Sequence, residues 1–322
     1  MKKLTTIAAM TAVVLTAAAP LAIAQDDYPN RPVELIIPYP PGGSDTLGRK
    51  IAETMVANTG ANIVVMNVPG ASTQVGSLQV ANAEPDGYTI YLPSPPEFVA
   101  GPVFYDDLPF DVQKDFTLIS FTAEAPYVLL VDPKLPVENH EEFLELLKSD
   151  PESILFGSYG SLSQSDIIAR RYRAETGIDF DIIPYSGGTP AFNALLAGEI
   201  QAVIATTIPT RGFIDEGQMR PLAVTTAERI ALYPDIPTMT ELGIDLVDSA
   251  SYGLAGPAGL PDHVVEYWNR EWTKAMNDPE TKAFIEDMGV SVVGSSPEEF
   301  QAWLDENIEL WKTFPEALGL EE

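Results

Sequence analysis

The run VELIIPYPPGGSD occupies residues 33–45 and begins as a short apolar strand that runs into a glycine-containing loop. A helical pattern follows from about Thr46 to Asn58, so the run predicts a strand, a loop and a helix start in that order. The same order recurs in NVPGASTQVG (67–76), FGSYGSLSQ (156–164) and PYSGGTP (184–190). Repeated units of this kind predict an α/β protein with mostly parallel sheets flanked by helices.

Apolar runs of four to seven residues alternate with helical patterns along the chain, and 322 residues exceed what one core usually fills. We therefore expect two lobes, with chain crossings at Ser120–Pro126 and Val224–Ile230. Lobe one then comprises residues 25–123 and 229–322, and lobe two residues 124–228. A ligand is expected in the cleft between them. The predicted strands are Val33–Tyr39, Asn62–Val68, Tyr88–Ser94, Pro126–Asp132, Ile154–Ser158, Asp181–Tyr185, Gln201–Thr207 and Leu222–Thr226.

Near the C-terminus, Ser296-Pro297-Glu298-Glu299 has the layout of a capping box that starts a helix. One apolar stripe follows, and its aromatic rings are expected in the core rather than in a ligand cage. The stripe consists of Phe300, Trp303, Leu304, Ile308 and Trp311.

The first residues have the pattern of an export signal. Lys2 and Lys3 precede an apolar stretch over residues 5–20, and Ala22-Ile23-Ala24 is a small-x-small cleavage sequence. This predicts a signal peptide over residues 1–24, cut after Ala24, and an exported mature chain. The alternative is an uncleaved anchor, but the apolar stretch is short for a membrane span.

Composition excludes several classes of function. With 47 Asp and Glu against 18 Lys and Arg, the formal charge is −29, which disfavours nucleic acids and anionic membrane surfaces as partners. The chain has no Cys and two His, His140, expected to be solvated, and His263, expected to be structural. Phosphate-loop, dinucleotide, nucleophile-elbow and zinc-protease motifs are absent from the sequence. We therefore expect no cofactor, no metal and no catalytic residue.

The glycine-containing loops suggest an anion site. Glycine lets backbone approach a ligand, and the N–H groups at a helix start carry partial positive charge. Serine and threonine hydroxyls supply further donors. A single loop of this kind is more often an ordinary turn with a helix cap, but three loops assigned to different lobes favour a ligand site.

The mature chain resembles the extracytoplasmic solute receptors of tripartite tricarboxylate transporters, the Bug family. The resemblance rests on the order and spacing of YPNRPV (28–33), PYPPGG (38–43), NVPGA (67–71), PDGYT (85–89), KDF (114–116), FGSYG (156–160), PYSGGTPA (184–191), LAVTT (222–226), Arg229 and PDIPTMTELG (234–243). It implies a two-lobed periplasmic binding protein of a type II-like fold that closes on a small solute. It also implies that a carboxylate is held by backbone N–H groups, hydroxyls and waters rather than by arginine.

Carried over by position, the resemblance implies a set of ligand-facing residues. Lobe one contributes Tyr39, Gly42, Gly43, Ser44, Ser72 and Ser94. Lobe two contributes Ser158, Ser161, Tyr185, Gly187, Gly188 and Thr206.

The chain departs from the family pattern after Ser161. Leu162 stands where the family has a small residue, and Asp166 stands where it has histidine. Asp166 is expected to cap the next helix. If it faces the cleft instead, it belongs to the ligand site and disfavours a second carboxylate.

Three functions are weighed. The first is a monomeric transport receptor that binds a small organic carboxylate and delivers it to membrane permease subunits. The second is an exported hydrolase or lyase, which the missing Ser–His–acid arrangement disfavours. The third is a periplasmic sensor that presents the same solute to a membrane kinase, and the sequence does not separate it from the first.

Overall fold

The computed structural model describes residues 28–70, 73–94, 98–99, 101, 103, 108–161, 163–312 and 314. The predicted signal peptide and Ser72 lie outside these residues. Within them ten strands form one sheet, in the order β2 (Ile63–Asn67), β1 (Val33–Ile37), β3 (Thr89–Tyr91), β9 (Ser249–Pro257), β4 (Phe116–Val131), β7 (Ala202–Thr206), β5 (Phe156–Ser158) and β6 (Ile182–Pro184). The other two strands, β8 (Arg220–Val224) and β10 (Ser291–Val292), pair with β4 as well.

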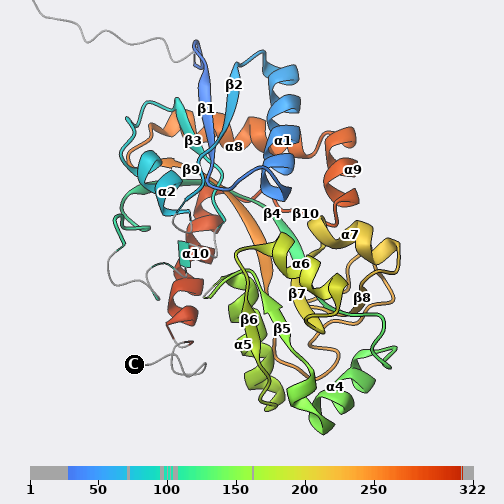
Figure 1. Cartoon of the computed structure of the whole chain (residues 1–322). Coiled ribbons are helices and arrows are strands. Elements are labelled where there is room, and N and C mark those ends of the chain that lie inside the picture. The colour runs from blue at the N-terminus through green and yellow to red at the C-terminus, as the bar shows by residue number, and fades with distance from the viewer. Residues whose placement is uncertain are drawn as a thin grey trace, which may run out of the picture.

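The upper half in Figure 1 is built around β1 (Val33–Ile37), which pairs in parallel with β2 (Ile63–Asn67) and β3 (Thr89–Tyr91). Helices α1 (Gly43–Thr59) and α2 (Gln74–Ala81) follow β1 and β2. The C-terminal part of the chain returns to this half. It supplies α8 (Asp262–Met276), α9 (Pro279–Asp287), β10 (Ser291–Val292) and α10 (Pro297–Trp311).

The lower half comes from the middle of the chain. Here β5 (Phe156–Ser158) pairs in parallel with β6 (Ile182–Pro184) and with β7 (Ala202–Thr206). The remaining elements are α4 (His140–Ser149), a 3₁₀ turn at Pro151–Ser153, α5 (Gln164–Thr176), α6 (Gly188–Ala197), α7 (Thr207–Asp215) and β8 (Arg220–Val224).

Two long strands join the halves. The strand β4 (Phe116–Val131) pairs antiparallel with β9 (Ser249–Pro257) over Phe116–Pro126, and then with β7 and β8 over 127–131. Figure 1 shows both strands running from the upper half into the lower one. The sheet is therefore parallel in its outer strands and antiparallel where the chain crosses.

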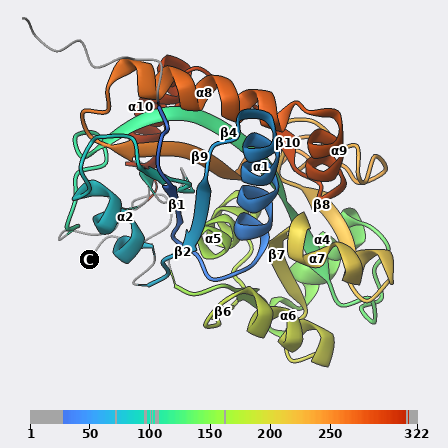
Figure 2. The ribbon, with the colours of Figure 1, turned by 90° about the horizontal axis from the view of Figure 1, so that it is seen from above.

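Each half has its own core on both faces of the sheet. In the upper half, Leu35 and Trp268 pack on the α1 and α8 face, and Ile36 and Phe300 pack on the face covered by α2 and α10. Figure 2, seen from above, shows α1 and α8 to one side of β1 and α2 to the other. In the lower half, Phe156 packs against α4 and α5, while the opposite face packs against α6.

Packing also bears on where the halves divide. Met239, Ile244 and Leu246 lie in the same core cluster as Phe156, so the segment after β8 packs with the lower half. The chain re-enters the upper half with β9, at Ser249. We therefore propose a later limit for lobe two, near Asp248, in place of residue 228.

The strands and helices predicted from the sequence are present within a few residues of their expected ends, except that β4 begins at Phe116 rather than Pro126. The strand β9 has no counterpart among the predicted strands. The capping box at α10 is confirmed, since the Ser296 hydroxyl accepts from Glu299 N at 3.2 Å and the Glu299 carboxylate accepts from Ser296 N at 2.8 Å. The described part of the chain contains no helix with the length and apolar character needed to cross a membrane.

Candidate functional site

The loop between β1 and α1 is braced by a chain of polar contacts. Arg49 donates to the Asp45 carboxylate at 2.8 Å and to the Asn67 side chain at 2.9 Å. Asn67 in turn donates to the Tyr39 carbonyl at 3.0 Å. The first turn of α1 and the end of β2 thus hold residues 39–45 in one shape.

Ser44 and the residue before Ser94 both contact the β9 strand. Ser44 hydrogen-bonds to the hydroxyl of Tyr252, whose pKa burial raises to about 12. Pro93, the neighbour of Ser94, accepts from Gly253 N at 3.0 Å. Ser44 and Pro93 therefore contact adjacent residues of one strand.

In the lower half, the predicted residues form a second group. Tyr185 N donates to the Ser158 carbonyl at 2.9 Å, which joins the ends of β5 and β6. The ring of Tyr159 stacks edge-on with Phe192 at 5.7 Å, and its hydroxyl lies beside the Thr206 backbone. A Cβ on Gly188 would approach the Tyr159 ring to 3.4 Å, so the start of α6 lies close to this group.

Asp166 does not cap α5, so that prediction is wrong. Ser163 is the N-cap, and its hydroxyl accepts from Asp166 N. The Asp166 side chain is 1% exposed, pairs with Arg170 at 2.8 Å and accepts from Ser158 Oγ at 3.2 Å. The hydrogen bond to Asp166 therefore fixes the Ser158 side chain, and Ser158 is itself buried.

The loop residues of the upper half contact those of the lower half at the starts of α1 and α7. A Cβ on Gly43 would lie 2.9 Å from Ile208 Cγ2, so the first loop packs directly against α7. Next to this contact, the Thr207 hydroxyl lies 3.5 Å from the carbonyls of Met288 and Gly289, at the end of α9. Residues 39–44, 185–188 and 206–208 are thus brought into one region between the halves.

Helix starts in this region have no side-chain cap. The N-caps Gly42, Gly187 and Thr206 of α1, α6 and α7 make no side-chain hydrogen bond to the first turn. By contrast, Asn139, Ser163, Asp278 and Ser296 cap α4, α5, α9 and α10. Among the other described α-helices, α2 and α8 are also uncapped, and α2 begins within the glycine-containing run 67–76. The first-turn N–H groups of these three helix starts have no side-chain cap, and N–H groups at a helix start carry partial positive charge.

Arginine side chains near the loops are already paired. Arg49 and Arg170 each bind a carboxylate of their own helix at 2.8 Å. The positive potential that an anion would meet therefore comes mainly from backbone N–H groups and hydroxyls.

The structure adds residues that the sequence analysis did not single out. Asn67 and Arg49 brace the first loop, Tyr252 holds Ser44, and Ile208 closes the contact between the halves. The i,i+4 spacing of Asp45 and Arg49 was a usable signal for the brace. The Ile208 contact depends on the tertiary fold and has no local signal. Of the predicted residues, Ser161 is exposed and Ser72 lies outside the described part.

His140 is buried, at 3% exposure, so its predicted solvation is wrong. Its Nε2 lies 2.9 Å from the Tyr172 hydroxyl, inside the core between α4 and α5. Among the described residues, no group of three or more His, Asp or Glu side chains is arranged to hold a metal ion.

The chain belongs to the family of receptors of tripartite tricarboxylate transporters, whose sequence profile matches residues 47–320. The protein BugT of Bordetella pertussis is 29% identical over 301 residues, which cover 92% of each chain. An R. palustris protein solved with adipate is 25% identical, with a TM-score of 0.84 over 91% of this chain and 99% of that one. MatC from Rhodopseudomonas palustris, solved with bound malate, is 25% identical, with a TM-score of 0.78 over 89% and 99%. The fold is that of periplasmic binding proteins, as predicted.

Proposed function

We propose that this protein is an extracytoplasmic receptor that binds a small organic carboxylate between its two halves and delivers it to membrane permease subunits. The observation that carries the proposal is the meeting of three uncapped helix starts, at Gly42, Gly187 and Thr206. Such starts bind anions through N–H groups, without a lysine or arginine.

The relatives support a carboxylate as the solute. Two structures of the same fold contain adipate and malate, which are both small dicarboxylates. The first loop supplies the Ser44 hydroxyl, and Tyr185 and Thr206 stand at the facing starts of α6 and α7. These groups match a ligand with anionic ends and a short carbon chain.

Binding without turnover is proposed as well. The buried His140 bonds to Tyr172, and His263 stacks edge-on with Tyr28 at 6.2 Å, so neither ring is placed beside the loop serines. With no histidine ring beside them in the described part of the chain, the serine hydroxyls are proposed to act as donors to a bound ligand. We also propose export by cleavage after Ala24 and a monomeric mature chain.

A thermal-shift screen tests the proposal. The protein is unfolded, freed of co-purified ligand and refolded, and then melted with a panel that includes adipate, malate, citrate, amino acids and sugars. The uncharged diamides of adipate and malate are the matched controls. Saturation with the right carboxylate adds roughly 3 kcal/mol, which corresponds to a rise of about 6 °C or more. Shifts with sugars or diamides alone, or with nothing in the panel, would overturn the assignment.

A further inference from the structure

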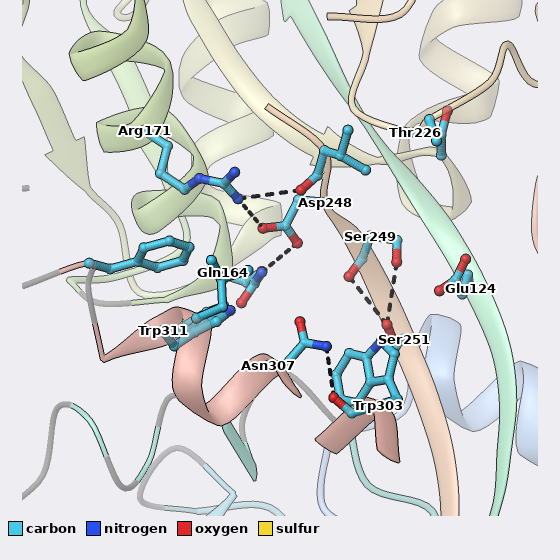
Figure 3. Close-up of a pocket in the computed structure, with 14 residues that line it drawn as sticks. Glu124, Gln164, Arg171, Thr226, Asp248, Ser249, Ser251, Trp303, Asn307 and Trp311 are labelled. Atoms are coloured by element: carbon cyan, nitrogen blue, oxygen red, sulfur yellow. Dashed lines mark hydrogen bonds and ion pairs between the residues drawn. The ribbon is translucent and has the colours of Figure 1, made fainter. Parts of the chain in front are cut away.

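A pocket of about 240 Å³ lies where α10 approaches α5, beside the strands that join the halves (Figure 3). Its lining comes from α10 and Phe314, from α5, from the segment 226–227 and 247–249, and from β4 and β9. None of the loop residues assigned to the carboxylate site lines it. It is therefore a separate cavity, and its capacity to bind a ligand does not depend on the carboxylate site.

One wall of the pocket carries a buried ion pair. Arg171 donates to the Asp248 carboxylate at 2.9 Å, and Gln164 donates to the same carboxylate at 2.7 Å. Figure 3 shows the two α5 side chains converging on Asp248. Because Asp248 and Arg171 neutralise each other, this wall contributes polar groups and no net charge.

Glu124 of β4 gives the pocket its charge. It forms no ion pair with any residue in the described part of the chain, and its lining neighbours Ser249 and Ser251 are uncharged. Burial raises the pKa of its carboxyl group, and a hydrogen bond from Ser249 partly offsets that effect. An ionised Glu124 leaves the lining with one negative charge in excess.

The facing wall is aromatic. Trp303 and Trp311 of α10 and the nearby Phe314 line the cavity, and Figure 3 shows Trp303 beneath Ser251. The Arg171 guanidinium already lies 5.0 Å from the centre of the Phe314 ring. Aromatic faces attract cations by their quadrupole, so this wall and Glu124 favour the same charge on a ligand.

We propose that this pocket is a second ligand site, which binds a small organic ammonium ion. The ammonium group pairs with Glu124, and the apolar body of the ligand lies against Trp303 and Trp311. The volume equals that of about eight water molecules, which suits an amine with about eight non-hydrogen atoms. The net charge of −29 on the chain concentrates cations at the surface and assists their entry.

An occupant of this pocket contacts both halves of the molecule. The helix α10 belongs to the upper core through Phe300 and Leu304, and α5 belongs to the lower core through Ile168 and Tyr172. A ligand between them binds with an affinity that depends on how the halves are arranged. If carboxylate binding shifts that arrangement, each ligand changes the affinity for the other by the same factor.

The test is a calorimetric titration of the full protein at pH 8 with benzylamine, which has eight non-hydrogen atoms and is cationic. Benzyl alcohol is the neutral control of the same size. We expect benzylamine to bind at least tenfold more tightly than benzyl alcohol and to change tryptophan fluorescence. Equal affinities, or no binding of benzylamine, would overturn the proposal.

Variants locate the site. Glu124→Gln keeps the shape and removes the charge, and we expect at least tenfold weaker benzylamine binding. Glu145→Gln, at an exposed position of α4, is the matched control and keeps wild-type affinity. Unchanged affinity in Glu124→Gln contradicts the site.

A second substitution covers the case in which Glu124→Gln fails to fold. Leu310, at the pocket edge, is 51% exposed, and Leu310→Lys adds a competing ammonium group there. It should weaken benzylamine binding, whereas Val64→Lys at a 44% exposed position on β2 should not. Carboxylate titrations of the same samples report the other site independently.

Discussion

Asp166 shows how one buried carboxylate can brace a loop of the proposed site. Its side chain joins Ser158 to Arg170 and is almost completely buried. A carboxylate in this position fixes the loop after β5, and its charge is largely balanced by the arginine. We therefore propose that Asp166 does not disfavour a ligand with two carboxylates.

We predict that Asp166→Asn lowers the free energy of unfolding by roughly 1–2 kcal/mol, because Arg170 loses its partner but its side chain is 24% exposed and water partly screens its charge. Carboxylate affinity should change by less than fivefold. The control is Asp179→Asn, whose carboxylate is 98% exposed. Urea unfolding and calorimetry measure both effects. A tenfold gain in dicarboxylate affinity would show instead that Asp166 faces the ligand.

A second single residue, His140, makes the free energy of unfolding depend on pH. Burial lowers its pKa from 6.5 to about 4, so between these values the folded protein binds fewer protons than the unfolded chain. Its contribution to stability is therefore complete above pH 6.5 and is lost as the pH falls toward 4. Relative to His140→Gln, the wild type should lose about 2.5 kcal/mol between pH 7 and pH 4.5. Urea unfolding measures this. Equal losses in the free energy of unfolding for the two proteins between pH 7 and pH 4.5 would contradict the prediction.

At the scale of elements, the helix starts divide into capped and uncapped ones. The starts of α4, α5, α9 and α10 use a side chain to satisfy their N–H groups. Those of α1, α6 and α7, which adjoin one another, do not. A helix start without a cap lacks the stabilising hydrogen bonds from a side chain to its first-turn N–H groups. A bound anion can accept hydrogen bonds from the same N–H groups.

This division predicts opposite effects on stability and binding at Gly42. The residue has an extended φ of 173°, and a Cβ there would meet only the Pro40 carbonyl, at 3.8 Å. Gly42→Asp should cap α1 and raise the free energy of unfolding by about 0.5 kcal/mol. The added charge should weaken carboxylate binding at least tenfold. Gly42→Ser, the uncharged cap, should weaken it far less. Equal affinities of the two variants would contradict an anion site at this helix start.

Elements also show what the sequence could and could not predict. The helix α10 was predictable because a capping box and an apolar stripe coincide there. β9 was not, because SASYGLAGP is rich in small residues and its place is set by pairing with the distant β4. At the site, the glycine loops had a local signal, and so did Ser163, whose hydroxyl caps α5 three residues before Asp166. The contact of Gly43 with Ile208 is created by tertiary packing, so no local pattern indicates it.

For the whole molecule, the excess of acidic residues opposes the capture of an anionic ligand. A net charge of −29 repels a dicarboxylate at long range, and salt screens that repulsion. We predict that the association rate constant rises about twofold or more between roughly 20 and 300 mM NaCl in stopped-flow measurements. A monocarboxylate ligand should show a smaller rise. A rate that falls with salt would indicate a locally basic entrance instead.

The most direct measurement is a crystal structure of the refolded protein with the carboxylate that gives the largest thermal shift. We predict density for the ligand between the halves, with carboxylate oxygens about 2.7–3.1 Å from backbone nitrogens at the starts of α1, α6 or α7. Density at the pocket beside Glu124, or a carboxylate held by an arginine away from these helix starts, would contradict the proposed site. A screen in which no carboxylate binds would contradict it before crystals are grown.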